Sequence, residues 1–133
     1  MTRFPSAEWA RIFEGSLNEN AAYEEAAQAW EGEIFLLILP DATAAHGEGV
    51  FLDLYHGKCR SARFVADATG VTAEFVFEGT RENWARVFHH ELDPINALLS
   101  GTFKIRGNLA KAMRFTRAAK ELVDTAAAVP TDV

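Results

Sequence analysis

Over the first thirty residues, apolar and polar positions repeat with the period of a helix. Apolar side chains recur three or four positions apart over residues 9–17, which predicts an amphipathic helix with Ser6 as its N-cap. Asn18 or Asn20 interrupts this helix and starts a second one, whose buried stripe covers residues 23–30. The chain is therefore expected to open with two helices.

Gly32 is expected to close the second helix, after which the period of the pattern changes to two. Residues 33–39 are apolar at nearly every position, so we expect both faces of this strand to be covered. Three strands that alternate between apolar and polar residues follow, at 50–55, 62–67 and 73–78. Turn sequences at 57–58 and 67–70 separate these strands, the second typical of a tight hairpin. The pattern predicts an antiparallel meander with one apolar face.

Two short helices with clear start signals come next. Gly79–Thr80 caps the first, and its apolar stripe consists of Trp84, Val87, Phe88 and Leu92. Asp93 followed by Pro94 begins the second, because aspartate is a good N-cap and proline fits the first helical position. Ser100–Gly101 is expected to end it.

A short strand at 103–106 leads to a long final helix, which Gly107–Asn108 caps and which is expected to reach about Ala126. One face of this helix carries mostly small residues: Ala112, Phe115, Thr116, Ala119, Leu122, Val123 and Ala126. Packed against a phenylalanine-rich sheet, small residues leave room for a gap unless the bulky sheet residues fill it. Residues from Val129 on are expected to fray.

The opposite face of the final helix is basic. From Lys104 to Lys120 there are six basic residues and no acidic one, although the whole chain has a net charge of −6. Two interpretations of this basic strip stay open. It is either an ordinary solvated face of the helix or a surface that attracts an acidic head group or an anionic membrane. The transient membrane contact predicted in the second case runs through Lys111, Arg114, Arg117 and Lys120.

Length and composition indicate a globular protein. The 133 residues suit a single domain over 1–133, which can bury enough surface to fold without disulfides. The negative net charge argues against nucleic acid as a partner. Cys59 is the single cysteine and no secretory signal pattern opens the chain, so a cytoplasmic location is expected. The oligomeric state stays open.

The sequence offers few groups for catalysis. His89 and His90 are adjacent on a helix and point about 100° apart, so they cannot easily share one metal ion. His56 and Cys59 bracket a turn, but no second pair of metal ligands is available at a suitable spacing. Asp53 alternates onto the face opposite its leucine neighbours, where nothing marks it as a base. We therefore predict no catalytic residue, no metal and no cofactor.

The segment from Phe77 to Met113 contains three groups of residues with a distinctive spacing. They are Phe77-x-Gly79-Thr80 with Trp84, Leu92-Asp93-Pro94 with Ala97-Leu98, and Gly101-x-Phe103-Lys104-Ile105-x-Gly107. In these motifs the segment resembles the sterol carrier protein 2 (SCP-2) family. The order of elements extends the resemblance over nearly the whole chain. Thr102 stands where many members have lysine, and Asn108 where many have aspartate, changes expected to affect surface charge and capping more than the fold.

The resemblance implies an α+β fold, with a five-stranded, mostly antiparallel sheet covered by about five helices. It also implies a hydrophobic tunnel between the sheet and the C-terminal helices, since members carry fatty acids, acyl-CoA, phospholipids or sterols. By position, the residues predicted to bind the ligand are Phe75, Phe77, Phe88, Leu98, Leu99, Phe103, Ile105, Phe115, Ala119 and Leu122.

The leading functional hypothesis is a non-catalytic lipid carrier for a fatty acid, an acyl-CoA, a sterol, an isoprenoid or a similar apolar ligand. The alternative is an accessory module that presents a prenyl or acyl substrate to a partner enzyme. Two further hypotheses are an enzyme such as a thioesterase, with His56, His89 or His90 as base, and a structural dimer with a filled core.

Overall fold

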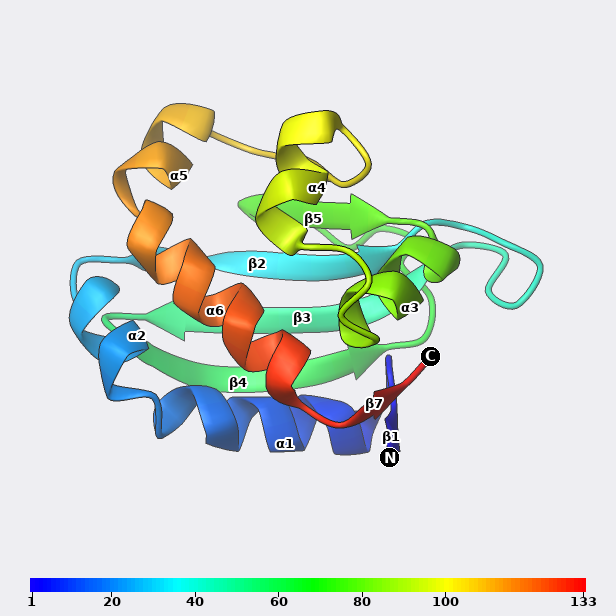
Figure 1. The fold of residues 1–133 in the computed structure, drawn as a ribbon, viewed down its shortest axis with the longest axis horizontal. Coiled ribbons are helices and arrows are strands. Elements are labelled where there is room, and N and C mark those ends of the chain that lie inside the picture. The colour runs from blue at the N-terminus through cyan, green and yellow to red at the C-terminus, as the bar shows by residue number, and fades with distance from the viewer.

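The computed structural model describes residues 1–133 and places helices over one face of a five-stranded sheet (Figure 1). The strands are β2 (Glu31–Ile38), β3 (Glu48–Tyr55), β4 (Lys58–Val65), β5 (Phe75–Gly79) and β6 (Lys104–Arg106). Their order in the sheet is β4-β3-β2-β5-β6, and only β2 and β5 run parallel. The predicted α+β class with a mostly antiparallel sheet is confirmed.

Six helices accompany the sheet, one more than the number expected. They are α1 (Ala7–Asn18), α2 (Ala21–Ala26), α3 (Arg81–Phe88), α4 (Pro94–Ser100), α5 (Leu109–Arg114) and α6 (Thr116–Ala128). In Figure 1, α6 crosses the face of the sheet while α1 runs along β4, against which it packs. Most of the core lies between this helical layer and the sheet.

The local start and stop signals act as predicted, except at Gly32. The Ser6 hydroxyl accepts a hydrogen bond from the amide of Trp9, and the Asn20 side chain caps α2 in the same way. Asp93 caps α4, and Gly101 ends α4 in the left-handed conformation that favours glycine. Gly32 was expected to close the second helix, but it lies inside β2, and α2 ends earlier, at Ala26.

The predicted meander of four strands is wrong at its last step. β5 does not pair with β4; it pairs with β2 in parallel and with β6. Residues 66–74 connect β4 to β5 across the outer face of the sheet, where Ala68, Val71 and Ala73 pack on Phe35 and Leu37. A tight hairpin would leave those two buried side chains of β2 in water, so the longer connection is favoured.

The final helix is broken in two. α5 ends and α6 begins at Phe115, whose backbone leaves the helical conformation at φ −119° and ψ 33°. The break turns α6 about its axis, so that Ala118 is buried and Ala119 and Thr116 are exposed. The prediction of one apolar face along the whole final helix is therefore wrong, because α5 and α6 each turn a different face toward the sheet.

The C-terminal residues were expected to fray, and they are instead ordered. β7 (Thr131–Asp132) pairs in parallel with β1 (Thr2–Arg3). The Trp9 indole donates a hydrogen bond to the buried Thr131 hydroxyl, with 3.0 Å between Nε1 and Oγ1. Since Val129 is also buried, the end of the chain is part of the core.

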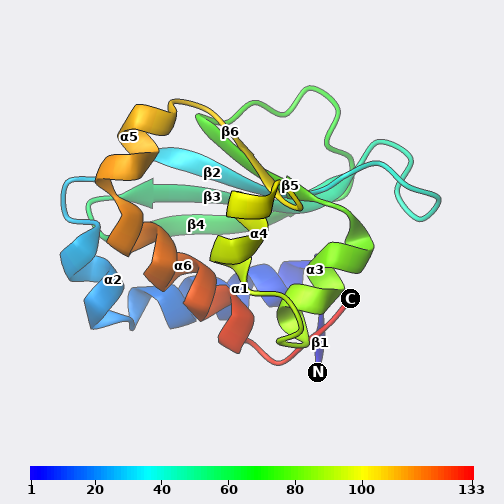
Figure 2. The ribbon, with the colours of Figure 1, turned by 45° about the horizontal axis from the view of Figure 1, so that its top comes forward.

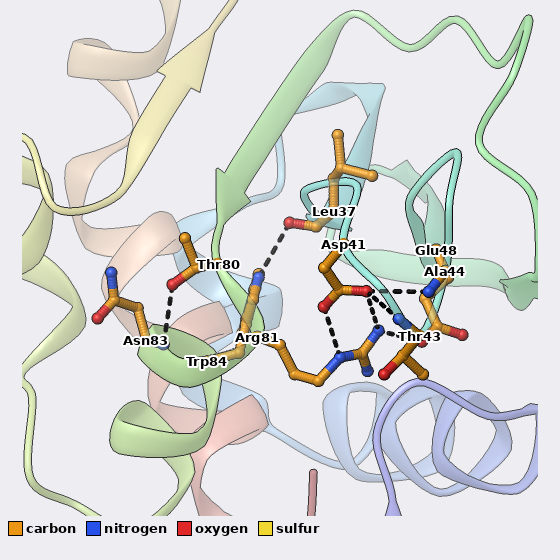
Figure 3. A network of polar contacts seen from close by, with 9 residues as sticks. All are labelled: Leu37, Asp41, Thr43, Ala44, Glu48, Thr80, Arg81, Asn83 and Trp84. Atoms are coloured by element: carbon orange, nitrogen blue, oxygen red, sulfur yellow. Dashed lines mark hydrogen bonds and ion pairs between the residues drawn. The ribbon is translucent and has the colours of Figure 1, made fainter.

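A network of charged side chains ties α3 to the loop between β2 and β3 (Figure 3). The Arg81 guanidinium lies 2.8 Å from Asp41 and 2.6 Å from the buried carboxylate of Glu48. The Trp84 indole donates to the carbonyl of Leu37 on β2. Hydrogen bonds from Arg81, and then from the amide of Ala44, lower the pKa of Asp41 to about 2.

Candidate lipid-binding cavity

An apolar cavity of about 50 Å³ lies between the sheet and the helices. All eleven residues that line it are apolar: Tyr23, Trp30, Ile34, Leu54, Phe75, Ile105, Ala112, Phe115, Ala118, Ala119 and Leu122. Figures 1 and 2 show α2, α5 and the beginning of α6 at the same end of the sheet. The cavity exists because the small residues of α5 and α6 face bulky residues of the strands without filling the space between.

A second apolar space, of about 10 Å³, lies further along α6. It is lined by Leu36, Phe77, Trp84, Val87, Phe88, Pro94, Leu122, Val123 and Ala126. Leu122 lines both spaces, and its side chain is buried. The two cavities therefore adjoin at this one leucine.

The larger cavity is too small for a long acyl chain in this conformation. An apolar cavity of about 150 Å³ in another protein holds one benzene molecule, and the present one has about a third of that volume. A lipid tail therefore needs a larger space than this conformation offers.

The ten residues predicted to bind the ligand fall into three groups. Phe75, Ile105, Phe115, Ala119 and Leu122 line the larger cavity, and Phe77, Phe88 and again Leu122 line the smaller one. Leu98 and Phe103 pack in the core without lining either space. Leu99 was placed wrongly, because α4 turns Ala97 inward and leaves Leu99 82% exposed.

The larger cavity also has lining residues that the prediction missed. Tyr23 and Trp30 come from the α2 region, Ile34 and Leu54 from central strands, and Ala112 and Ala118 from the two C-terminal helices. Burial of Tyr23 and Trp30 was visible in the sequence as a helical stripe. Their place beside the C-terminal helices was not, since it depends on the packing of α2 against α6.

Lys111 holds α5 against the sheet at the edge of the larger cavity. Its Nζ atom lies 2.6 Å from the Glu74 carboxylate and also donates to the backbone carbonyl of Glu31. The same ammonium group sits 4.8 Å above the centre of the Trp30 ring, which lines the cavity. One residue of α5 thus contacts β2 at Glu31, Glu74 just before β5, and the cavity wall.

No reactive group stands out in or near the cavity. Burial, with a smaller effect of Cys59, raises the pKa of Tyr23 well above its usual value. Burial likewise raises the pKa of the Cys59 thiol to about 12, so the thiol stays protonated at neutral pH. His56 is exposed and pairs with Glu31 at 2.7 Å, and His89 and His90 are exposed. No group of three side chains is placed to hold a metal ion, and no helix has the length and apolar character to cross a bilayer.

A sheet covered by helices that enclose a purely apolar cavity defines an α+β domain with an apolar interior site. The chain belongs to the SCP-2 sterol transfer family, whose model matches residues 7–120. The resemblance seen in the sequence is thereby confirmed.

Solved structures agree with this assignment. A crystal structure of sterol carrier protein 2 shares 37% sequence identity, with a TM-score of 0.85 over 93% of this chain and 97% of the other. A conserved hypothetical protein of Thermus thermophilus, described as possibly a sterol carrier protein, shares 34%, with a TM-score of 0.84 over 99% of this chain and 93% of the other. The UbiJ-SCP2 ubiquinone synthesis protein has the same fold at 11% identity, with a TM-score of 0.55 over 90% and 93% of the two chains. Among curated proteins, none matches the chain.

Proposed function

We propose that this protein is a non-catalytic carrier of a fatty acid, an acyl-CoA, a sterol or a similar apolar molecule, and that it works in the cytoplasm. The ligand occupies a tunnel that forms when α5 and α6 move away from the sheet and the two cavities join. The observation that carries the proposal is the larger cavity, whose lining is entirely apolar in a chain of the SCP-2 family.

The energetics of such a site favour binding through the tail. Each buried methylene contributes about 0.8 kcal/mol, so a long acyl chain gains on the order of 10 kcal/mol before the cost of association. What remains corresponds to roughly micromolar affinity without any specific polar contact. Chain length should therefore change affinity more than the head group does.

Native mass spectrometry of the purified protein, followed by organic extraction, tests the proposal most directly. A co-purifying acyl or isoprenoid species, or uptake of palmitic acid by protein without ligand, is the expected result. A clean mass that stays unchanged when palmitic acid is offered would instead favour a filled core.

Substitution of Ala119 tests where the ligand enters. Ala119 lines the larger cavity but is itself exposed, so it stands at the rim. Ala119→Trp should block uptake of palmitic acid and change the free energy of unfolding by less than about 1 kcal/mol, because the indole stays outside the core. Ala128→Trp, an exposed alanine of α6 away from both cavities, is the matched control. Uptake by Ala119→Trp at the level of this control would contradict an entrance under α6.

A second candidate function is that of an accessory module that presents a prenyl or acyl substrate to a partner enzyme. It uses the same cavity, and the shared fold with a protein named for ubiquinone synthesis brings it into consideration. Direct transfer distinguishes the two functions. A carrier exchanges ligand with lipid vesicles by itself, whereas an accessory module releases it only when the partner enzyme is added.

A further inference from the structure

The positive charges of this protein are concentrated in one segment. Residues 94–120 contain six basic side chains and no acidic one. The whole chain has 13 basic and 19 acidic residues. The residues outside 94–120 therefore contain seven basic and all nineteen acidic side chains. Charge separation of this degree creates a local positive potential on an otherwise acidic protein.

The same segment carries most of the large apolar side chains that water contacts. Leu99 is 82% exposed, Met113 is 76% exposed and Leu109 is 54% exposed, which makes three of the five exposed large apolar residues of the chain. Leu99 belongs to α4, and the other two belong to α5, the one helix without a buried residue. In Figure 1 both helices lie along the edge of the molecule opposite α1.

Ion pairs decide which cations of the segment are free. Lys111 and Lys120 are each 2.6 Å from an acidic partner, Glu74 and Asp124 respectively. Arg117 pairs more loosely with Glu25, at 3.8 Å, so three of the four cations predicted for membrane contact are already paired. Lys104 and Arg114 are exposed and have no acidic partner. The free positive charge therefore lies on β6 and on α5, the helix that also carries Leu109 and Met113.

We propose that Leu99, Leu109 and Met113, together with Lys104 and Arg114, form a docking surface for an anionic lipid bilayer. Apolar side chains that protrude beside cations suit the boundary between acyl chains and acidic head groups. The proposal rests on the proposed carrier function and names its partner. α5 also lines the larger cavity through Ala112, so a bilayer bound to α5 meets the helix that must move to admit a lipid.

Sedimentation with vesicles tests this surface, using phosphatidylcholine alone and an equal mixture with phosphatidylglycerol. The protein should bind the mixed vesicles, and added salt should weaken the binding. Leu109→Ser combined with Met113→Ser should weaken it at least about tenfold, because two side chains no longer enter the bilayer. Arg114→Glu should weaken it at least about fivefold. Arg11→Glu makes the same charge change on an exposed, unpaired arginine of α1 and should have little effect.

Uptake of palmitic acid from solution, without vesicles, separates this proposal from the carrier function. The docking variants should take it up like the unchanged protein, because none of these residues lines the cavity. Uptake without binding to mixed vesicles would overturn the docking surface and leave the carrier function standing, whereas vesicle binding without uptake would do the reverse. An effect of Arg11→Glu as large as that of Arg114→Glu would also overturn it, because binding would then follow net charge alone.

Discussion

Leu122 is the one residue that the linings of the two apolar cavities share. Its side chain is buried on α6 and forms part of the wall of both apolar cavities. Every other wall residue lines only one of the two spaces, so we expect a rotation of the Leu122 side chain or a small shift of α6 to join them. We therefore expect Leu122 to limit the length of the tail that the protein holds.

Leu122→Ala should join the cavities permanently. The protein should lose about 2–5 kcal/mol in its free energy of unfolding, the usual cost of such a truncation. Its affinity for palmitic acid should rise relative to that for decanoic acid, because the longer chain fills the new space. Urea unfolding and titration with both acids measure the two effects.

Leu17→Ala is the matched control for this change. Leu17 is fully buried on α1 and lines neither cavity, so its truncation should destabilise the protein without changing the preference for chain length. An unchanged preference in Leu122→Ala would show that the two spaces are not parts of one binding site.

Among the helices, α5 is the one without a buried residue. It has six residues and none is buried, so few apolar contacts oppose its movement. Its main polar attachment to the sheet is Lys111, which pairs with Glu74 and donates to the carbonyl of Glu31. Movement of α5 therefore requires that these contacts break.

Lys111→Ala should speed the exchange of a bound fatty acid by about two- to fivefold, the effect of losing an ion pair of this exposure. Stopped-flow transfer of a fluorescent fatty acid to vesicles measures the rate. Lys120→Ala is the control, because the ion pair of Lys120 with Asp124 lies within α6 and joins it to nothing else. Equal rates in the two variants would mean that α5 is not the element that opens.

For the molecule as a whole, the Arg81 network makes stability depend on pH. It joins α3, β3 and the loop after β2, segments far apart in the sequence (Figure 3). The pKa of Asp41 is about 2 in the folded protein, below its ordinary value of 3.8. The ionised carboxylate therefore stabilises the fold above about pH 4, and this contribution is lost as the pH falls toward 2.

Asp41→Asn should be less stable than the unchanged protein near pH 7, and the difference should shrink as the pH falls from about 4 to about 2. Urea unfolding at a series of pH values gives the free energies to compare. Glu91→Gln alters an exposed carboxylate without an ion pair and should leave the curve unchanged. A difference between Asp41→Asn and the unchanged protein that stays constant down to pH 2 would contradict the role of this carboxylate.

What the sequence by itself determined was local. Ser6, Asp93 with Pro94, and Gly101 place helix ends through contacts within a few residues, and period-two alternation locates strands. The family resemblance added the kind of sheet and the expectation of an apolar space beneath the C-terminal helices. Phe75 and Phe115, predicted by position to bind the ligand, line the larger cavity.

Only the tertiary structure decided how these pieces meet. The pairing of β5 with β2 depends on covering Phe35 and Leu37 on the outer face, and the order at Thr131 depends on Trp9, more than a hundred residues away. Exposure of Leu99 likewise follows from which side of α4 faces the core. Periodicity and capping depend on interactions between residues that are close in the sequence. Strand order, cavity walls and exposed surfaces depend instead on which side chains from distant parts of the chain pack together and exclude water.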